Sequence, residues 1–264
     1  MTARRLLLAM AAICSALPAF SVEVGEFEGG AHGFPAVFDL AGKKLADGDF
    51  SQWMEDGRLH VRITYHYKSG QRIEEKAVLR PKPELLQERW LWRESKGDML
   101  EREFAVDFKT QMATAKKREN GVLRTWSEKI EVQLGRAFAG FGFALALQNL
   151  RGHLLHNESI ELQAVGFNPK PVMVPVELSH SSIDEMEMAD RLVKGDRFVI
   201  HPKIPAIAKL FVNVTDIRIW LTKPPAGFLR WEGPIAEPED AIIRVDLIPG
   251  AQSGAAKVVE RGSN

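Results

Sequence analysis

The chain has 264 residues, of which 45% are hydrophobic, and its 35 Lys and Arg residues balance 35 Asp and Glu residues. This balance argues against a nucleic-acid partner, which requires a basic surface, and against a chain kept unfolded by its own charge. The length suffices for one large β domain with a sizeable core.

Residues 1–21 have the three-part pattern of a secretory signal peptide. Arg4 and Arg5 precede an apolar run from Leu6 to Leu17, and Ala19 to Ser21 supplies the small residues of a cleavage site. We therefore expect the mature protein to be periplasmic or secreted.

The only cysteine, Cys14, lies inside this leader, so the sequence predicts a mature chain without disulfides or thiolate metal sites. Lipid anchoring at Cys14 is the less favoured alternative, because Ile13 stands where a lipidation site has a small residue. The longest later apolar run, Ala137 to Leu147, has 11 residues, whereas a membrane-spanning helix needs about 20. We expect no transmembrane span.

Residues 22–33 are rich in Gly and Glu and are predicted to be a flexible lead-in. From Pro35 onward, apolar and polar residues alternate, as in strands with one dry face and one wet face. The clearest strand runs from Arg58 to Tyr67, and Asp56-Gly57 and Lys68-Ser69-Gly70 supply turns at its two ends. Its apolar face carries Leu59, Val61, Ile63, Tyr65 and Tyr67. Its polar face, which we expect to be solvated, carries Arg58, His60, Arg62, Thr64 and His66.

The same alternation predicts further strands, and Asn120-Gly121 is a strong hairpin signal before one of them. These strands are Gln71–Leu79, Leu86–Glu94, Leu100–Phe108, Val122–Trp126, Ser159–Val165, Val172–Leu178, Ile183–Met188, Arg197–Ile200, Ile217–Leu221, Phe228–Trp231 and Ile242–Leu247.

One segment, Phe138 to Leu150, is apolar nearly all the way round and predicts a buried helix, with a buried strand as the alternative. Gly140 and Gly142 each weaken such a helix by about 1 kcal/mol relative to Ala, which suggests a close approach to its neighbours. A second, short helix is predicted at Ile204 to Phe211, and a disordered tail at residues 249–264.

Together these elements predict an all-β fold with a single β-rich domain over residues 34–248. We expect a strongly curved antiparallel sheet or open β-barrel with one buried helix in its concavity.

No cluster of polar side chains gives a strong signal for catalysis or metal binding. His153 and His156, with Glu158 and Glu161 nearby, have the spacing of a metal site if the helix extends that far, but a polar helix end explains them better. The serines around His180 lack the context of a nucleophile. The paired carboxylates Glu74-Glu75, and Glu185 with Glu187, are typical of solvated strand faces. We assign no catalytic residue, metal ligand or cofactor.

Large aromatic side chains are the more informative set. Trp and Phe residues on neighbouring strands could line a cavity for an apolar ligand, or could simply fill the core of a wide sheet. The candidate ligand-binding residues are Trp90, Trp92, Phe104, Phe108, Phe138, Phe141 and Phe143.

The last third of the chain contains three segments whose arrangement resembles part of a known protein family. Its elements are Gly195 to Pro205, Asp216 to Thr222 with Trp220-Leu221 near its end, and Pro224 to Gly233 after a short proline turn. This arrangement resembles the closing hairpin of a family of exported bacterial β-proteins of unknown function. Their curved sheet with a helix in its concavity is similar to the periplasmic lipoprotein-carrier architecture. The resemblance implies a fold and a compartment, and no catalytic residues.

Three functions are open at this point. The first is an exported, non-catalytic protein that binds or carries an apolar or lipid-like ligand. The second is a cell-envelope module that binds another protein through its surface or a sheet edge. The third is a hydrolase, in which His153, His180 or His201 would converge in a cleft.

Overall fold

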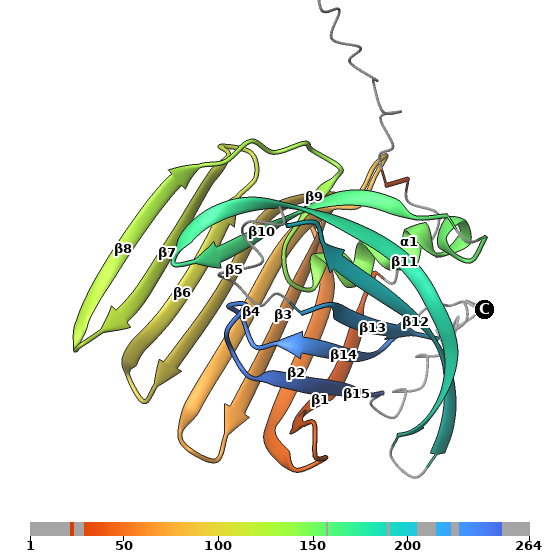
Figure 1. Cartoon of the computed structure of the whole chain (residues 1–264), viewed down its shortest axis with the longest axis horizontal. Helices are drawn as coiled ribbons and strands as arrows, with labels where there is room; N and C mark the ends of the chain where they lie inside the picture. Colours follow the sequence, from red (N-terminus) through yellow and green to blue (C-terminus); the bar gives the residue numbers. More distant parts are fainter. Residues whose placement is uncertain are drawn as a thin grey trace, which may run out of the picture.

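The computed structural model describes residues 22–23, 29–156, 158–188, 191–204, 215–222 and 227–249. They form one 15-stranded, largely antiparallel open sheet with a single short helix, which confirms the predicted mainly-β architecture (Figure 1). The predicted signal peptide (1–21), nearly all of the predicted helix Ile204–Phe211 and nearly all of the predicted tail (249–264) lie outside the described residues.

The sheet has two halves. The first consists of β1 (Ala31–Asp39), β2 (Lys44–Glu55), β3 (Arg58–Tyr67), β4 (Gln71–Arg80), β5 (Leu86–Lys96), β6 (Met99–Asp107), β7 (Met112–Glu119) and β8 (Val122–Lys129). The second consists of β9 (Ala137–Phe138), β10 (Ile160–Asn168), β11 (Lys170–Met188), β12 (Arg191–Pro202), β13 (Ile217–Leu221), β14 (Phe228–Pro234) and β15 (Ile242–Pro249). β15 pairs with β1 and thereby joins the halves.

Tight hairpins build the first half. Asp56 and Gly57, and likewise Asn120 and Gly121, adopt positive φ angles, as a two-residue hairpin turn requires. The strand Arg58–Tyr67 has the predicted bounds. β2 and β7 are absent from the predicted strands. The residues that β7 buries are small, and Ala113 and Ala115 give only a weak apolar alternation.

The second half is less regular than predicted. Val172–Leu178 and Ile183–Met188, predicted as separate strands, are one long strand, β11. The polar stretch around His180 suggests a turn in the sequence, but a bulge between His180 and Ser182 lets the pairing with β12 continue past it.

The sheet curls without closing. β8 and β9 end the strand order, so the described strands form no continuous barrel. β11 arches over the concave side and lies against β7 and β8, where Lys170 Nζ is 3.2 Å from a Glu128 carboxylate oxygen (Figure 1). The concave space between the two halves holds the core and the helix.

The helix α1 spans Gly142–Leu154, four residues later than predicted. The residues before it are not helical, because Ala137–Phe138 forms strand β9 and Gly140 adopts a φ of 52° in a turn. The Gln87 side chain accepts from the Ala139 N–H at 2.7 Å and donates to its carbonyl at 3.0 Å. These bonds hold the segment against β5 and delay the helix.

The two faces of the first half divide apolar from charged residues. The inner face supplies much of the core, including Phe104 and Phe108, which are each 1% exposed. The outer face carries carboxylates paired with cations; Glu103, for example, contacts Arg93 and Lys116. The wet face predicted for β3 belongs to this outer face.

The predicted lead-in is ordered where it is described. Val22 lies in the core at 1% exposure and accepts a hydrogen bond from the Leu85 N–H at 2.9 Å. Glu23 forms a bridge with Glu84, and β1 already begins at Ala31. Backbone pairing therefore fixes both ends of a segment whose composition alone suggested flexibility.

Candidate ligand-binding cavity

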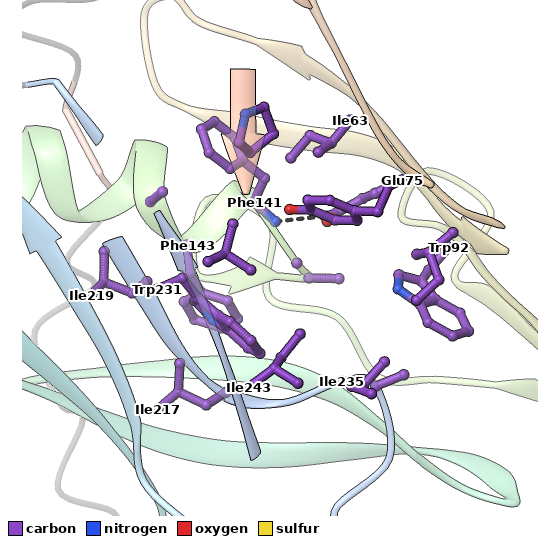
Figure 2. Close-up of a pocket in the computed structure, with 18 of the residues that line it drawn as sticks. Ile63, Glu75, Trp92, Phe141, Phe143, Ile217, Ile219, Trp231, Ile235 and Ile243 are labelled. Carbon is purple, nitrogen blue, oxygen red and sulfur yellow. Dashed lines mark hydrogen bonds between the residues drawn. The ribbon is translucent and has the colours of Figure 1, made fainter. Parts of the chain in front are cut away.

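A cavity of about 210 Å³ lies between the two halves of the sheet. Ile63, Glu75 and Trp92 lie on one side of it, and Ile219, Trp231 and Ile243 face them from the other (Figure 2). The start of α1 and the β14–β15 loop (residues 235–241) complete the wall.

The wall is almost wholly apolar. The 27 described residues that line it include Tyr65, Tyr67 and Glu75 as the titratable ones, and no Lys or Arg. They are Pro35, Phe50, Ile63, Tyr65, Tyr67, Ile73, Glu75, Trp90, Trp92, Ala139, Gly140, Phe141, Phe143, Ala144, Ala164, Val165, Ile200, Ile217, Ile219, Phe228, Trp231, Pro234, Ile235, Ala236, Ile243, Val245 and Leu247. An engineered apolar cavity of about 150 Å³ binds benzene, so this space is large enough for an organic molecule.

The structure brings together four of the seven predicted ligand-binding residues. Trp90, Trp92, Phe141 and Phe143 line the cavity. Phe104, Phe108 and Phe138 do not; they lie fully buried behind the wall. Ring stacking links the two groups, with 5.5 Å between the ring centres of Trp92 and Phe104, and 5.9 Å between those of Phe138 and Phe143.

Glu75, the one acidic residue among the described wall residues, was not predicted. It was grouped with Glu74 as a solvated pair, but the two carboxylates point to opposite faces of β4. Strand alternation could have predicted its inward position, because Glu75 lies on the same face of the strand as Ile73 and Ala77, which are buried on the inner face. The wall residues from β13 to β15 were also missed, since only the curl of the sheet brings them opposite β3 to β5.

The Glu75 carboxylate is fixed by two donors. Its Oε1 accepts from Trp90 Nε1 at 2.8 Å and from the Phe141 backbone N–H at 2.7 Å; the bond from Phe141 is visible in Figure 2. Burial raises the pKa of Glu75, although both hydrogen bonds favour the ionised form. No described residue donates a hydrogen bond to Oε2.

Gly140 and Gly142 make this arrangement possible. A Cβ on Gly140 would collide with Glu75 Oε1 and Trp90 Nε1, and a Cβ on Gly142 would collide with the Gln87 amide. The close approach that the sequence analysis inferred for these two glycines is therefore an approach to the polar anchors of the cavity wall.

Two tyrosines line the cavity from the inner face of β3, and Tyr65 is the one near Glu75. Burial, followed by the nearby charges of Glu75 and Tyr67, raises the pKa of Tyr65 well above its usual value. Burial and the charge of Glu94 raise the pKa of Tyr67 to about 12. The buried Tyr67 hydroxyl has no hydrogen-bond partner among the described residues.

The β14–β15 loop covers one side of the cavity and is held by ion pairs. Its Ile235 and Ala236 line the wall. Arg102 Nη1, on β6, donates to Glu237 at 2.8 Å and to both oxygens of Asp240, and Arg102 Nε donates to Glu94 at 2.6 Å. The loop thus spans from β14 and β15 to the far half of the sheet.

The other predicted clusters do not assemble. His153 pairs with Glu158 at 3.4 Å, whereas His156 Nδ1 lies 2.7 Å from the Gly152 carbonyl oxygen. His180 is half-buried near Asp196, and His201 is exposed and bound to Asp216. No group of three or more His, Cys, Asp or Glu residues in the described parts of the chain is arranged to hold a metal ion.

Comparison with known proteins adds no relative: no protein-family model and no curated protein matches this chain. No helix in the described residues is long and apolar enough to cross a membrane.

Proposed function

We propose that this protein is an exported, non-catalytic protein that binds or carries an apolar or lipid-like ligand in the cavity between the two halves of its sheet. The cavity itself carries the proposal. Protein interiors are otherwise close-packed, so a cavity of about 210 Å³ lined by apolar side chains is the size and character of a ligand site.

The composition of the wall supports a ligand of this class. Ligand sites are typically apolar and aromatic, with a few polar groups that orient the ligand. Here large aromatic and aliphatic side chains surround Glu75, Tyr65 and Tyr67. The histidines that a hydrolase would need do not converge, so the geometry favours binding over catalysis.

Native mass spectrometry of the protein purified from the cells that produce it tests the proposal. We expect a bound apolar molecule that is released on unfolding.

A second test uses N-phenylnaphthylamine, an uncharged dye that fluoresces in apolar surroundings. Ala164→Phe places a ring in the cavity and should abolish dye binding, whereas Ala105→Phe, a control on the outer face of β6, should not. Equal dye binding by both variants would refute the assignment of the cavity.

A second candidate function is a protein-binding module, which would bind its partner through the edge strand β8. Its outer edge is unpaired among the described strands, and Val122 is 63% exposed. Unpaired edges can accept a strand from a partner. Cross-linking from a reactive group placed at residue 122, in envelope extracts, would capture a partner if this edge is the functional surface.

A further inference from the structure

We propose that the ligand is an apolar amine, and that its ammonium group binds against the Glu75 carboxylate inside the ring of aromatic side chains. This inference rests on the proposed function and names the ligand class for the same cavity.

The first argument is the missing counter-ion. Elsewhere in this molecule, poorly exposed carboxylates have cationic partners: Glu74 has Arg62, Arg72 and Lys76, and Asp196 has Arg151. Glu75 faces the cavity, and the described residues that line this cavity include no Lys or Arg. A buried carboxylate without a positive partner is costly, and a ligand cation would supply that partner.

The second argument is the orientation of the carboxylate. Trp90 and the Phe141 N–H both donate to Oε1, so Oε1 is saturated. Oε2 accepts no hydrogen bond from the described residues. An ammonium group has only hydrogen-bond donors to offer, which matches the acceptor that remains.

The third argument is the aromatic surroundings. Trp92 is directly opposite Glu75 in the β4–β5 pairing, Trp90 contacts its carboxylate, and the Phe141 ring lies 5.1 Å from that of Phe50, another wall residue. The faces of aromatic rings attract cations, and cages of such rings recognise ammonium ligands. The same wall disfavours a fatty acid, whose carboxylate would face the charge of Glu75.

Tryptophan fluorescence gives a direct test, since Trp90, Trp92 and Trp231 line the cavity. Wild-type protein is titrated near neutral pH with octylamine, octanol and octanoate, which share one apolar chain. We expect octylamine to bind most tightly and octanoate least tightly.

The Glu75→Gln variant keeps an acceptor for both N–H donors but removes the charge. It should weaken octylamine binding by about tenfold or more and leave octanol binding nearly unchanged. Glu74→Gln is the matched control, because it makes the same change one residue away on the outer face and should leave all three affinities unchanged.

The outcomes separate the two proposals. Octanol binding with no preference for octylamine, or octylamine binding that survives Glu75→Gln, would overturn the amine assignment and leave an apolar carrier. Failure of all three compounds to bind wild-type protein would overturn the proposed function and the amine assignment together.

Discussion

At the residue scale, polar groups on an apolar inner face define the candidate site. Glu75 and Gln87 face inward from β4 and β5, and both bind the backbone just before α1. Both residues position the segment that closes the cavity, and Glu75 also forms part of the cavity wall. Substitutions here should affect stability and ligand binding together.

Gly140 gives a sharp test of this packing. Gly140→Ala should destabilise the protein by about 2–4 kcal/mol, because its φ of 52° is unfavourable for Ala and its Cβ would collide with Glu75. The control is Gly152→Ala, inside α1, where a Cβ would meet no atom within 4 Å and should stabilise the helix by about 1 kcal/mol. Urea unfolding measures both changes. Similar effects of the two substitutions would contradict the proposed contact.

The tyrosines provide a pH test. Tyr65 and Tyr67 are the chain's 2 tyrosines, and both have raised pKa values, that of Tyr67 reaching about 12. The ultraviolet absorbance of tyrosinate should therefore appear in the folded protein only near pH 12, whereas the urea-unfolded chain should titrate near the usual value of 10.0.

The same shifts predict a loss of stability at high pH. Above pH 10.0 the unfolded chain releases its phenolic protons before the folded protein does, so the free energy of unfolding should fall as the pH rises towards 12. Tyrosinate absorbance near pH 10 in protein that circular dichroism shows to be folded would contradict the burial of both rings.

At the element scale, the β14–β15 loop and α1 convert an open sheet into an enclosed cavity. The loop is held by Arg102, and α1 is held by Arg151, whose Nε donates to Asp196 on β12 at 2.9 Å. The Arg102 contact joins the two halves of the sheet across the concave side, whereas the Arg151 contact ties α1 to the second half. Neither is visible in local sequence, since the partners are distant along the chain.

The Arg102 contact should be important for stability. Arg102→Leu leaves Glu94, Glu237 and Asp240 without this guanidinium in a poorly exposed site, and should cost about 3–5 kcal/mol. Arg89→Leu is the control on a neighbouring strand: its side chain is 71% exposed, so its effect should stay within about 0.5 kcal/mol. Denaturant unfolding compares them, and equal losses would show that the loop is not held in this way.

At the scale of the whole molecule, the sheet separates an apolar concave side from a charged convex side. Glu74, Glu88 and Glu103 on the outer face each contact two or more cations. Partial burial opposes their ionisation, but hydrogen bonds and charges from neighbouring Lys and Arg residues outweigh it and lower the pKa of each carboxyl.

These lowered pKa values predict acid sensitivity. The contribution of these three carboxylates to stability is fully present above pH 4.5, the ordinary pKa of Glu. It should be lost as the pH falls through their lower pKa values in the folded protein. The contribution of Glu75 to stability changes with pH in the opposite direction, because its raised pKa favours the folded state at low pH. Glu103→Gln should reduce the loss in urea-unfolding stability on acidification, whereas Glu187→Gln, at an exposed position, should not. An unchanged acid profile in Glu103→Gln would refute the role of this face.

Local pattern was enough to predict much of the fold. The alternation from Arg58 to Tyr67 and the Asp56-Gly57 and Asn120-Gly121 turns determined strand bounds and hairpins, because side-chain periodicity and positive φ are properties of adjacent residues. The sequence also predicted a helix and placed four aromatic residues that the structure finds in the cavity wall. The signal peptide, the exported location and the ligand stay predictions.

Only the tertiary structure decided where the helix starts and which residues meet. Gln87 and Glu75 bind the Ala139 and Phe141 backbone from 52 and 66 residues away, and these bonds override the helical pattern at residues 138–141. The curl of the sheet sets Trp231 and Ile243 opposite Ile63 and Glu75 (Figure 2). Both outcomes depend on long-range contacts, whose formation follows from the packing of the whole sheet and leaves no local periodicity in the sequence.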